Sequence, residues 1–542
     1  MRSEAEDWFL TAQERGNAVT QLDRRHADGR AWSDGNAVRP LVHGAAYFAR
    51  LHDELQPLQA GDRVYFTDWR GDADERLLPD GPTIGELLVG LVHRGVEVRG
   101  LLWRSHSDLL TFSAQQNQHL GRLLNEAGGE ALLDQRVRRF GAHHQKLVVV
   151  RHRDQPERDV AFVGGIDLCH SRRDDDRHEG DPQTSPLDRR YGPRAPWHDA
   201  ALELRGPVVG DLLECFVERW DDPRPLDRRT PYRIVVQRLA DMPRHPARLP
   251  ERFPDPPLAG SCAVQVLRTY VYKRPTYPFA PDGERSVARA YAKAFSRARS
   301  LIYLEDQYLW SEPVARGLAA ALARSPELRL VAVVPRYPDQ DGRVSGPPNR
   351  LGQLRALELL RSTAPDRVAV YDLESPSSVP VYVHAKICIV DDVWFTCGSD
   401  NFNRRSWTCD SEITCAVLDP RRDERAPRDP GGHGDGARRL ARDLRLQVWR
   451  EHLDRPTGDG VGDPGDAALL DPAEGFALWH DTAAALDAWH ASGCRGPRPP
   501  GRVRHHQPEP VSRWQRLWAE PLYRLVYDPD GRPWRQRRRG AF

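Results

Sequence analysis

The chain has 542 residues, of which 29% are charged, and its formal net charge at pH 7 is +1. This composition is that of a globular protein with a sizeable core, and the near-zero net charge excludes an overall electrostatic footprint for nucleic acid. No apolar stretch is long enough to span a bilayer, and the first residues lack a signal-peptide pattern. The eight cysteines form no Cys-x-x-Cys pair, which indicates reduced, buried thiols. We therefore expect a cytoplasmic protein, and the bias toward Arg, Ala, Gly and Pro resembles that of high-GC bacteria.

Strands and helices alternate in the first part of the chain. A helix is expected over 83–94, because Thr83 and Glu86 have capping-box spacing and apolar residues follow on one face. The other elements expected here are strands over 63–69, 96–103, 146–150 and 161–168 and a helix over 109–127.

The same order of elements recurs later. We expect strands over 301–308, 328–334, 368–371, 384–390 and 394–401 and helices over 311–323, 350–362 and 437–453. Tyr65 precedes His144 by 79 residues and Tyr303 precedes His384 by 81, which indicates an internal duplication. The pattern predicts two α/β units with mixed, largely parallel sheets.

Changes in composition suggest where these units begin and end. Residues 242–260 are rich in proline and are expected to be a linker. We predict a leader over 1–60, a first half over 61–241, a second half over 261–455 and a C-terminal appendage over 456–542.

Two short motifs stand out, His144-Gln145-Lys146 and His384-Ala385-Lys386. Each precedes an apolar run of strand type, and in a strand the histidine and the lysine share one face. The chain has only four lysines, at positions 146, 273, 293 and 386, so two of the four lie in these motifs. A chain that otherwise uses arginine keeps lysine here, where a compact point charge is useful.

Such a pair suits the displacement of a phosphodiester. A neutral imidazole can attack phosphorus to give a phosphohistidine, and a second, protonated imidazole can give its proton to the leaving oxygen. Two lysines, with serine, asparagine and backbone donors, can stabilise the charge on the equatorial oxygens. Neither motif alone supplies all of these groups.

These residues resemble the phospholipase D superfamily, whose pattern is His-x-Lys, four residues, Asp, then six residues and Gly-Ser-x-Asn. The second copy has the whole pattern, in His384, Lys386, Asp391, Gly398, Ser399 and Asn401. In the first copy, His143 to Lys146, Phe162 to Leu168 and Pro196 to Asp199 look like the phospholipase D branch itself. The resemblance covers roughly residues 60–455.

The resemblance implies two α/β/α sandwich halves, related by a pseudo-twofold axis, with one active site between them and no metal or other cofactor. It implies hydrolysis or exchange of phospholipid head groups through a phosphohistidine. His144 would be the nucleophile and His384 the general acid and base, while Lys146, Lys386, Ser399 and Asn401 would hold the phosphate. A phospholipid is then the expected partner, with peripheral contact to a membrane, no nucleic acid, and a monomer favoured.

One position departs from the pattern. Arg151 stands where the first copy should carry Asp, and Asp154 or Asp159 could replace that Asp structurally. Asp391, included in the catalytic set by resemblance, lies seven residues after His384. This odd number points it away from the motif face, so we interpret it as a strand-end residue.

Other residues are candidates for support of the site. We expect Asp167, Asp199 and Glu412 to orient the imidazoles, with Gly165 in the adjoining turn, and the sequence leaves open which acid serves which ring. His143 and His198 are expected to be supporting or surface residues. The acidic run 174–176 is expected to be a solvated loop, with a metal site as the minor alternative.

Two rival functions remain open. One is a nuclease or another non-lipid phosphodiesterase that uses the same site, and the other is a degenerate, non-catalytic binder of lipid or phosphate.

At the C-terminus, Trp514, Leu517 and Trp518 are interleaved with arginines. We favour a helix packed on the body of the protein over an interfacial anchor.

Overall fold

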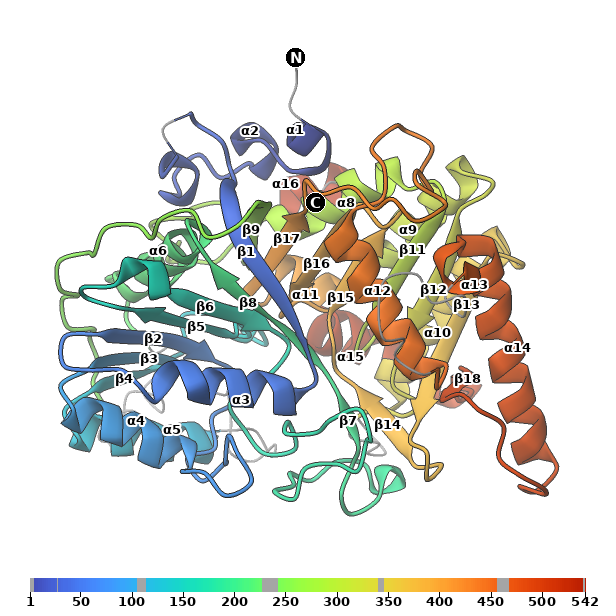
Figure 1. Cartoon of the computed structure of the whole chain (residues 1–542), viewed down its shortest axis with the longest axis horizontal. Helices are drawn as coiled ribbons and strands as arrows, with labels where there is room; N and C mark the ends of the chain where they lie inside the picture. The colour runs from blue at the N-terminus through green and yellow to red at the C-terminus, as the bar shows by residue number, and fades with distance from the viewer. Residues whose placement is uncertain are drawn as a thin grey trace.

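The structure is a computed structural model that describes residues 4–26, 28–104, 114–226, 242–339, 346–455, 467–539 and 542. Two halves lie side by side, each built on a β-sheet with helices on its faces (Figure 1). The predicted α/β class, with two α/β/α halves, is confirmed.

The first sheet has the strand order β1-β8-β6-β5-β2-β3-β4. Its strands are β1 Ser33–Val42, β2 Arg63–Asp68, β3 Glu97–Trp103, β4 Glu130–Asp134, β5 Leu147–Arg151, β6 Val160–Gly164 and β8 Ala200–Arg205. Neighbours β2, β3 and β4 are parallel, and the other pairs are antiparallel. The sheet is therefore mixed, with its parallel part confined to one side.

The second sheet repeats this order as β9-β17-β16-β15-β11-β12-β13. Its strands are β9 Cys262–Tyr270, β11 Leu301–Glu305, β12 Arg329–Val333, β13 Val368–Glu374, β15 Ile387–Val390, β16 Trp394–Gly398 and β17 Glu412–Leu418. Again three strands, β11, β12 and β13, are parallel. A turn of three residues joins β15 to β16, and only antiparallel strands can be joined so tightly.

Strand β1 connects the two sheets. It pairs with β8 over residues 37–42 and, through Ser33 and Asn36, with β9 of the second sheet. Helix α3, Gly44–Leu55, follows β1 directly and buries Tyr47, Phe48 and Leu51. The segment 1–60, expected as a leader, is thus corrected in part: it contributes a strand and a helix to the first half because their backbone and side chains complete its sheet and core.

Helices cover both faces of each sheet, and three large cores result among the described residues. The outer core of the first half lies under α3, α4 (Ile84–His93) and α5 (Ala114–Glu126). The outer core of the second half lies under α8 (Ser286–Arg297), α9 (Glu312–Arg324) and α10 (Gly346–Thr363). The expected helical residues 109–113 lie outside the described part of the chain.

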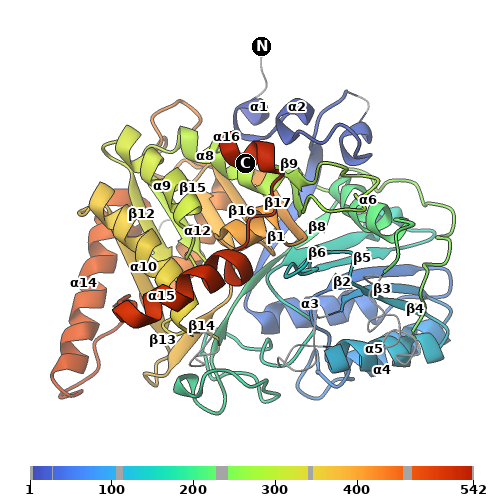
Figure 2. The ribbon, with the colours of Figure 1, turned by 180° about the vertical axis from the view of Figure 1, so that it is seen from behind.

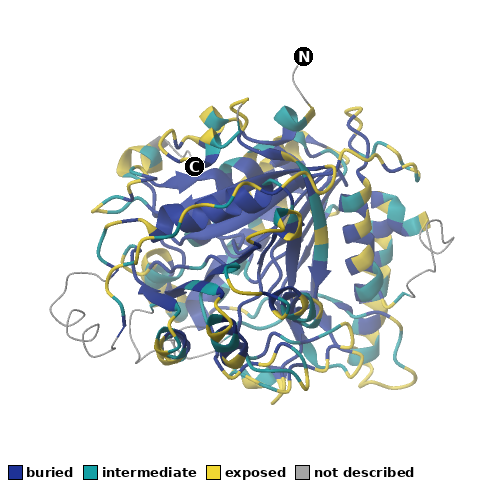
Figure 3. Cartoon of the chain, turned by 60° about the vertical axis from the view of Figure 1, so that its left-hand side comes forward, coloured by how far each residue is buried: buried dark blue, intermediate teal, exposed yellow. Residues whose placement is uncertain are grey.

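The third core joins the two halves. It includes α6 (Val208–Trp220), α12 (Arg439–His452) and α14 (Pro472–Ala491). The strands reach two cores by alternation, since Leu147 and Val149 of β5 point into the shared core and Val148 and Val150 into the outer one. Figure 3 shows the buried strands enclosed by helices whose outer faces are exposed.

The C-terminal segment packs on the second half. Trp479 and Ala483 of α14 lie in the shared core, and β18 (Val503–His505) pairs with β13. Helix α15 (Arg513–Leu522) packs against α10 (Figure 2). The described residues after 466 are therefore integral to the second half, which corrects the expectation of an appendage. The predicted bounds of the domains otherwise stay a prediction.

Among the described residues, no helix combines the length and the apolar character that crossing a membrane requires. The remaining strands and α-helices of the described residues are β7 (Trp197–His198), β10 (Glu284–Arg285), β14 (Pro380–Val383) and the short helices α1 (Glu4–Trp8), α2 (Ala12–Arg15), α11 (Arg404–Thr408), α13 (Ala467–Leu470) and α16 (Trp534–Arg539).

A buried ion cluster holds α12 to the turn between β15 and β16. Oδ2 of Asp392 lies 2.9 Å from Nε of Arg442, and its Oδ1 lies 2.6 Å from Nε of Arg445. Burial opposes ionisation, but the two guanidinium groups hold the pKa of Asp392 below its usual value. Asp392→Ala would leave two buried cations without their carboxylate.

We expect Asp392→Ala to lower the free energy of unfolding by about 3–5 kcal/mol, since breaking a buried ion pair costs this much. Urea unfolding measures the change. Asp443→Ala is the matched control: this carboxylate pairs with Arg425 but is 47% exposed, so a loss within about 1 kcal/mol is expected. Equal losses in the two variants would contradict the assignment.

Candidate active site

The imidazole of His144 is held by a carboxylate from the other half. His144 lies three residues before the start of β5 in the first sheet, and its Nδ1 lies 2.9 Å from Oε2 of Glu412. Glu412 is the first residue of β17 in the second sheet. The backbone supports this contact, because the N–H of His144 donates to the carbonyl of Ser411 at 2.9 Å.

The imidazole of His384, in the second half, is held by a carboxylate from the first half. Nδ1 of His384 lies 2.6 Å from Oδ2 of Asp199, which stands between β7 and β8 in the first half. The N–H of His384 donates to the carbonyl of His198 at 2.8 Å. Each half thus supplies the carboxylate that orients the histidine of the other half. Both rings use Nδ1 for this purpose, which leaves Nε2 for chemistry.

The two lysines are buried beside these rings. Nζ of Lys146 lies 3.1 Å from Oδ1 of Asp167 and donates to the carbonyl of His144 at 3.2 Å. Lys386 donates to the carbonyl of His384 in the same way. Asp167, expected to orient an imidazole, therefore holds a lysine instead. Burial opposes its ionisation, but Lys146 keeps the pKa of Asp167 below its usual value.

Electrostatics joins the two motifs into one site. Burial lowers the pKa of both imidazoles well below the usual value. Lys386 of the second motif lowers the pKa of His144, and Lys146 of the first lowers the pKa of His384. Each lysine therefore acts electrostatically on the opposite ring as well as on the ring of its own motif. In the absence of substrate both rings are held neutral, and an anionic phosphodiester between them would favour a proton on one.

The turn after β16 supports the His144 carboxylate. Oγ of Ser399 donates to Oε2 of Glu412 at 2.5 Å and accepts from the N–H of Ile413 at 3.0 Å. Burial raises the pKa of Glu412 to about 7, against the effect of the Ser399 hydroxyl. Ser399, expected to hold phosphate, is thus engaged with Glu412. Asn401 is 3% exposed, and its Oδ1 has no hydrogen-bond partner among the described residues.

Gly165 makes room for the other orienting carboxylate. Its N–H donates to the carbonyl of Ala200 at 2.9 Å. A Cβ added at Gly165 would lie 2.2 Å from Oδ1 of Asp199, a distance at which one of the two groups must shift. Any side chain here would displace the partner of His384, so the expectation that Gly165 belongs to the site has a steric basis.

Asp391 lies at the far end of β15 from His384. Its carboxylate accepts the N–H groups of Arg299, Ser300 and Leu301, each at 2.8 Å, where β11 begins. Burial raises its pKa to about 6 despite these donors. The extended strand thus separates the carboxylate of Asp391 from the imidazole of His384. Asp391 is a strand-end residue, as its odd spacing of seven residues from His384 predicts.

At the corresponding end of β5, Arg151 is buried and paired. Its Nε lies 2.6 Å from Oδ2 of Asp159, and Oδ1 of Asp159 accepts the N–H of His152 at 2.6 Å. The charge of Arg151 is therefore compensated by a carboxylate within the same hairpin. This replacement is remote from Lys146 and leaves the site intact.

Aromatic and cationic side chains near the rings had no specific signal in the sequence. The ring of Trp197 lies 5.1 Å from that of His384, and the guanidinium of Arg172 lies 3.9 Å over Trp197. Trp69 lies 6.2 Å from His144. Of these residues, only Trp197 lies within a stretch that carries the family resemblance, Pro196 to Asp199. Arg172 could not have been found, since no spacing links it to either motif.

For a phosphodiester with an activated leaving group, which departs without a proton from His384, we expect kcat/KM to have an alkaline limit near pH 8. Burial, assisted by Lys146, lowers the pKa of Lys386 to about 8, so its charge is present below this pH and lost above it. On the acid side, the lowered pKa of His144 keeps this ring neutral below its usual titration range. The measurement is kcat/KM from about pH 5 to about pH 10.

Lys386→Arg is the matched variant for this profile. Its guanidinium stays charged over the whole range, so the alkaline limb should move upward even where the absolute rate falls. An alkaline limb that stays near pH 8 in Lys386→Arg would show that another group controls it.

The chain is similar to known phospholipases D along much of its length. The family model for phospholipase D matches residues 58–230, and that for the phospholipase D-like domain of cardiolipin synthase matches residues 291–426. Phospholipase D alpha 1 of Zea mays is 26% identical over 518 aligned residues, which cover 72% of this chain and 61% of that protein. Phospholipase D alpha 1 of Ricinus communis is 25% identical over 516, covering 72% and 62%. The chain thus spans about three fifths of the length of these relatives.

Among solved structures, phosphatidylserine synthase from Haemophilus influenzae Rd KW20 is similar with a TM-score of 0.47 and 15% identity, over 71% of this chain and 82% of that one. One His-x-Lys motif lies in each segment matched by a family model. The chain belongs to the phospholipase D superfamily.

Proposed function

We propose that this protein is a phosphodiesterase that cleaves or exchanges the head group of phospholipids through a phosphohistidine. The observation that carries the proposal is the crosswise contact of Glu412 with His144 and of Asp199 with His384, beside two buried lysines. Two oriented imidazoles and two cations are the groups that a two-step displacement at phosphorus needs.

In the first step, Nε2 of His144 attacks phosphorus and forms a P–N bond while the P–O bond to the head group breaks. His384 gives the leaving oxygen its proton, so the head group departs as a neutral hydroxyl. In the second step, His384 removes a proton from water or an alcohol, whose oxygen displaces His144 and restores both rings. Lys146 and Lys386 stabilise the charge on the non-bridging oxygens throughout.

The acceptor and the substrate class are tested together. Purified protein is assayed against a panel of phospholipids with and without ethanol, and both the released head group and the phosphatidyl product are quantified. Phosphatidate alone indicates hydrolysis, and phosphatidylethanol indicates exchange. Cleavage of DNA but no phospholipid would favour the nuclease alternative and overturn the lipid assignment.

The covalent intermediate has its own test. Rapid acid-free denaturation during turnover, followed by mass spectrometry of the peptide that contains His144, should show the added phosphatidyl mass. A protein that only binds lipid or phosphate leaves this mass unchanged, and that result would overturn the enzymatic proposal.

We also propose peripheral contact with a phospholipid surface through α15. Ala519 and Tyr523 pack inward, whereas Trp514 and Leu517 are 81% and 70% exposed. Trp514, Leu517 and Trp518 share one face of the helix, and arginines flank them, which is the pattern of an interfacial helix.

We expect the double substitution Trp514→Ser and Leu517→Ser to reduce binding to anionic vesicles by at least about tenfold, because two apolar side chains no longer enter the interface. Vesicle sedimentation measures this. Turnover of a soluble short-chain phosphodiester is the control and should be unchanged. Unaltered vesicle binding would exclude this face.

A further inference from the structure

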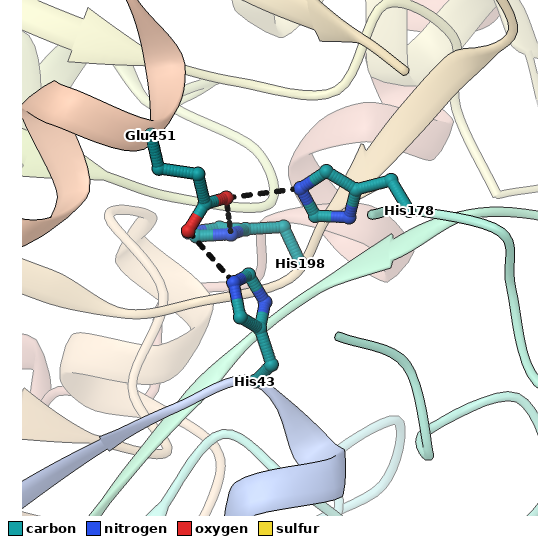
Figure 4. Close-up of side chains that lie close together, drawn as sticks. All are labelled: His43, His178, His198 and Glu451. Atoms are coloured by element: carbon teal, nitrogen blue, oxygen red, sulfur yellow. Dashed lines mark hydrogen bonds and ion pairs between the residues drawn. The ribbon is translucent and has the colours of Figure 1, made fainter. Parts of the chain in front are cut away.

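Four side chains converge between the two halves, outside the active site. His43 lies between β1 and α3, His178 lies in the segment between β6 and β7, and His198 is in β7; Glu451 comes from α12 of the second half. Figure 4 shows the three rings turned toward the one carboxylate. One ligand atom from each of the four lies within 4.8 Å of the others. We propose that these four residues bind one divalent transition-metal ion of the Zn²⁺ class.

The distances place the imidazole nitrogens around the carboxylate. Nε2 of His43 lies 2.8 Å from Oε2 of Glu451, and Nε2 of His178 lies 3.0 Å from Oε1. Nδ1 of His198 lies 3.7 Å from Oε1. A tetrahedral zinc ion holds its nitrogen and oxygen ligands at about 2.0–2.2 Å, and therefore roughly 3.4 Å from one another. Small side-chain movements bring the four atoms to that spacing.

The donor set selects the class of ion. Three imidazoles and one carboxylate suit zinc or a neighbouring first-row ion, whereas calcium and magnesium prefer oxygen ligands. The three histidines are at most 6% exposed and the Glu451 side chain is 10% exposed. Four protein ligands in so closed a place are typical of a structural zinc site.

A second carboxylate fixes the orientation of one ligand. Nε2 of His198 lies 2.7 Å from Oε2 of Glu305, which turns Nδ1 of His198 toward the cluster. Metal-bound histidines commonly use their other nitrogen in this way. Nδ1 of His198 is buried and has no hydrogen-bond partner among the described residues, so it is a polar atom aimed into the site.

The backbone at two of the ligands is strained. His43 has a φ of 71° and His178 a φ of 54°, both in the left-handed region that non-glycine residues rarely adopt. Strained residues persist where the surrounding structure requires them, and they gather at ligand sites. A network of ion pairs alone gives no reason for two such residues to meet at one carboxylate.

The ion would affect the active site only by holding the neighbouring backbone in place. His198 precedes Asp199, and the carbonyl of His198 accepts the N–H groups of His384 and Ala385 at 2.8 and 3.2 Å. A metal that joins β7 to α12 therefore fixes the strand that ends directly before Asp199, the partner of His384. It takes no part in the displacement at phosphorus, and the inference goes beyond the proposed function without depending on it.

The experiment uses the full chain without an affinity tag. Chelator-treated protein is incubated with ZnSO4, freed of excess ion, and analysed by elemental mass spectrometry and thermal unfolding. We expect one zinc per chain and a Tm several degrees above that of the chelated protein. His178→Ala should lose both the zinc and the rise in Tm. His480→Ala, which removes a histidine that is 61% exposed on α14, should keep them.

A direct spectroscopic test covers the case in which His178→Ala does not fold. One equivalent of Co²⁺ added to the chelated wild-type protein should give the intense visible absorption of a four-coordinate site, and zinc should abolish it. Less than about 0.1 equivalent of bound zinc, a Tm that zinc leaves unchanged, or the weak spectrum of octahedral Co²⁺ would each overturn the proposal.

Discussion

His144→Ala and His384→Ala are each expected to lower kcat for a phosphodiester by about 10³-fold or more, because one removes the nucleophile and the other the group that transfers protons. Both rings lie between carboxylate and lysine partners that remain in place in the variants. The measurement is the steady-state kcat for a soluble phosphodiester whose leaving group is an unactivated alcohol, which needs a proton from His384 to depart.

The two variants should differ in one respect. With an activated leaving group, which departs without a proton, His384→Ala should still form the phosphohistidine and should fail mainly in the second step, whereas His144→Ala should form none. His93→Ala, at an exposed position near the end of α4, is the control and should retain full turnover. Wild-type rates in both active-site variants would disprove the assignment.

Glu412→Gln is expected to lower kcat by about 10²–10⁴-fold while KM changes little. An ionised carboxylate accepts the Nδ1 proton of His144 and so leaves a lone pair on Nε2. An amide can donate to Nδ1 instead, which favours the tautomer that carries its proton on Nε2 and cannot attack phosphorus. Asp199→Asn should have an effect of similar size through His384, although each substitution lies in the half opposite to the ring it affects.

Asp487→Asn is the matched control for these two variants. Asp487 also faces an imidazole nitrogen, Nδ1 of His505 at 2.9 Å, but in a part-exposed pair that joins α14 to β18. It should leave kcat unchanged. If all three variants unfolded at the same reduced denaturant concentration and lost activity in parallel, the carboxylates would be structural and would not act on the imidazoles.

The histidine and lysine of each motif could be predicted from the sequence, whereas the carboxylate that contacts each histidine could not. His-x-Lys followed by an apolar run specifies a strand and a shared face, so His144 with Lys146 and His384 with Lys386 were predictable. The partners of the rings were not, because Glu412 is 268 residues from His144 and Asp199 is 185 from His384. Only the packing of the two sheets brings them together.

The elements that were missed have weak local signals. Strand β1 contains Gly35, Asn36 and Pro40, which disfavour strands, yet it forms because both β8 and β9 offer it hydrogen-bond partners. Helix α14 is rich in alanine and shows little periodicity, and its burial depends chiefly on Trp479. Both β1 and α14 therefore depend on contacts with distant parts of the chain more than on their own sequences.

The exchange of carboxylates between the halves has a consequence during protein synthesis. A nascent chain that has emerged from the ribosome only as far as residue 411 already contains the first His-x-Lys motif, but His144 has no Glu412 to orient it. Domains generally fold from the N-terminus as they are made. The first sheet can therefore assemble while its nucleophile is still unaligned, and the newly made protein acquires its reactive centre only when the last third of the chain folds onto the first.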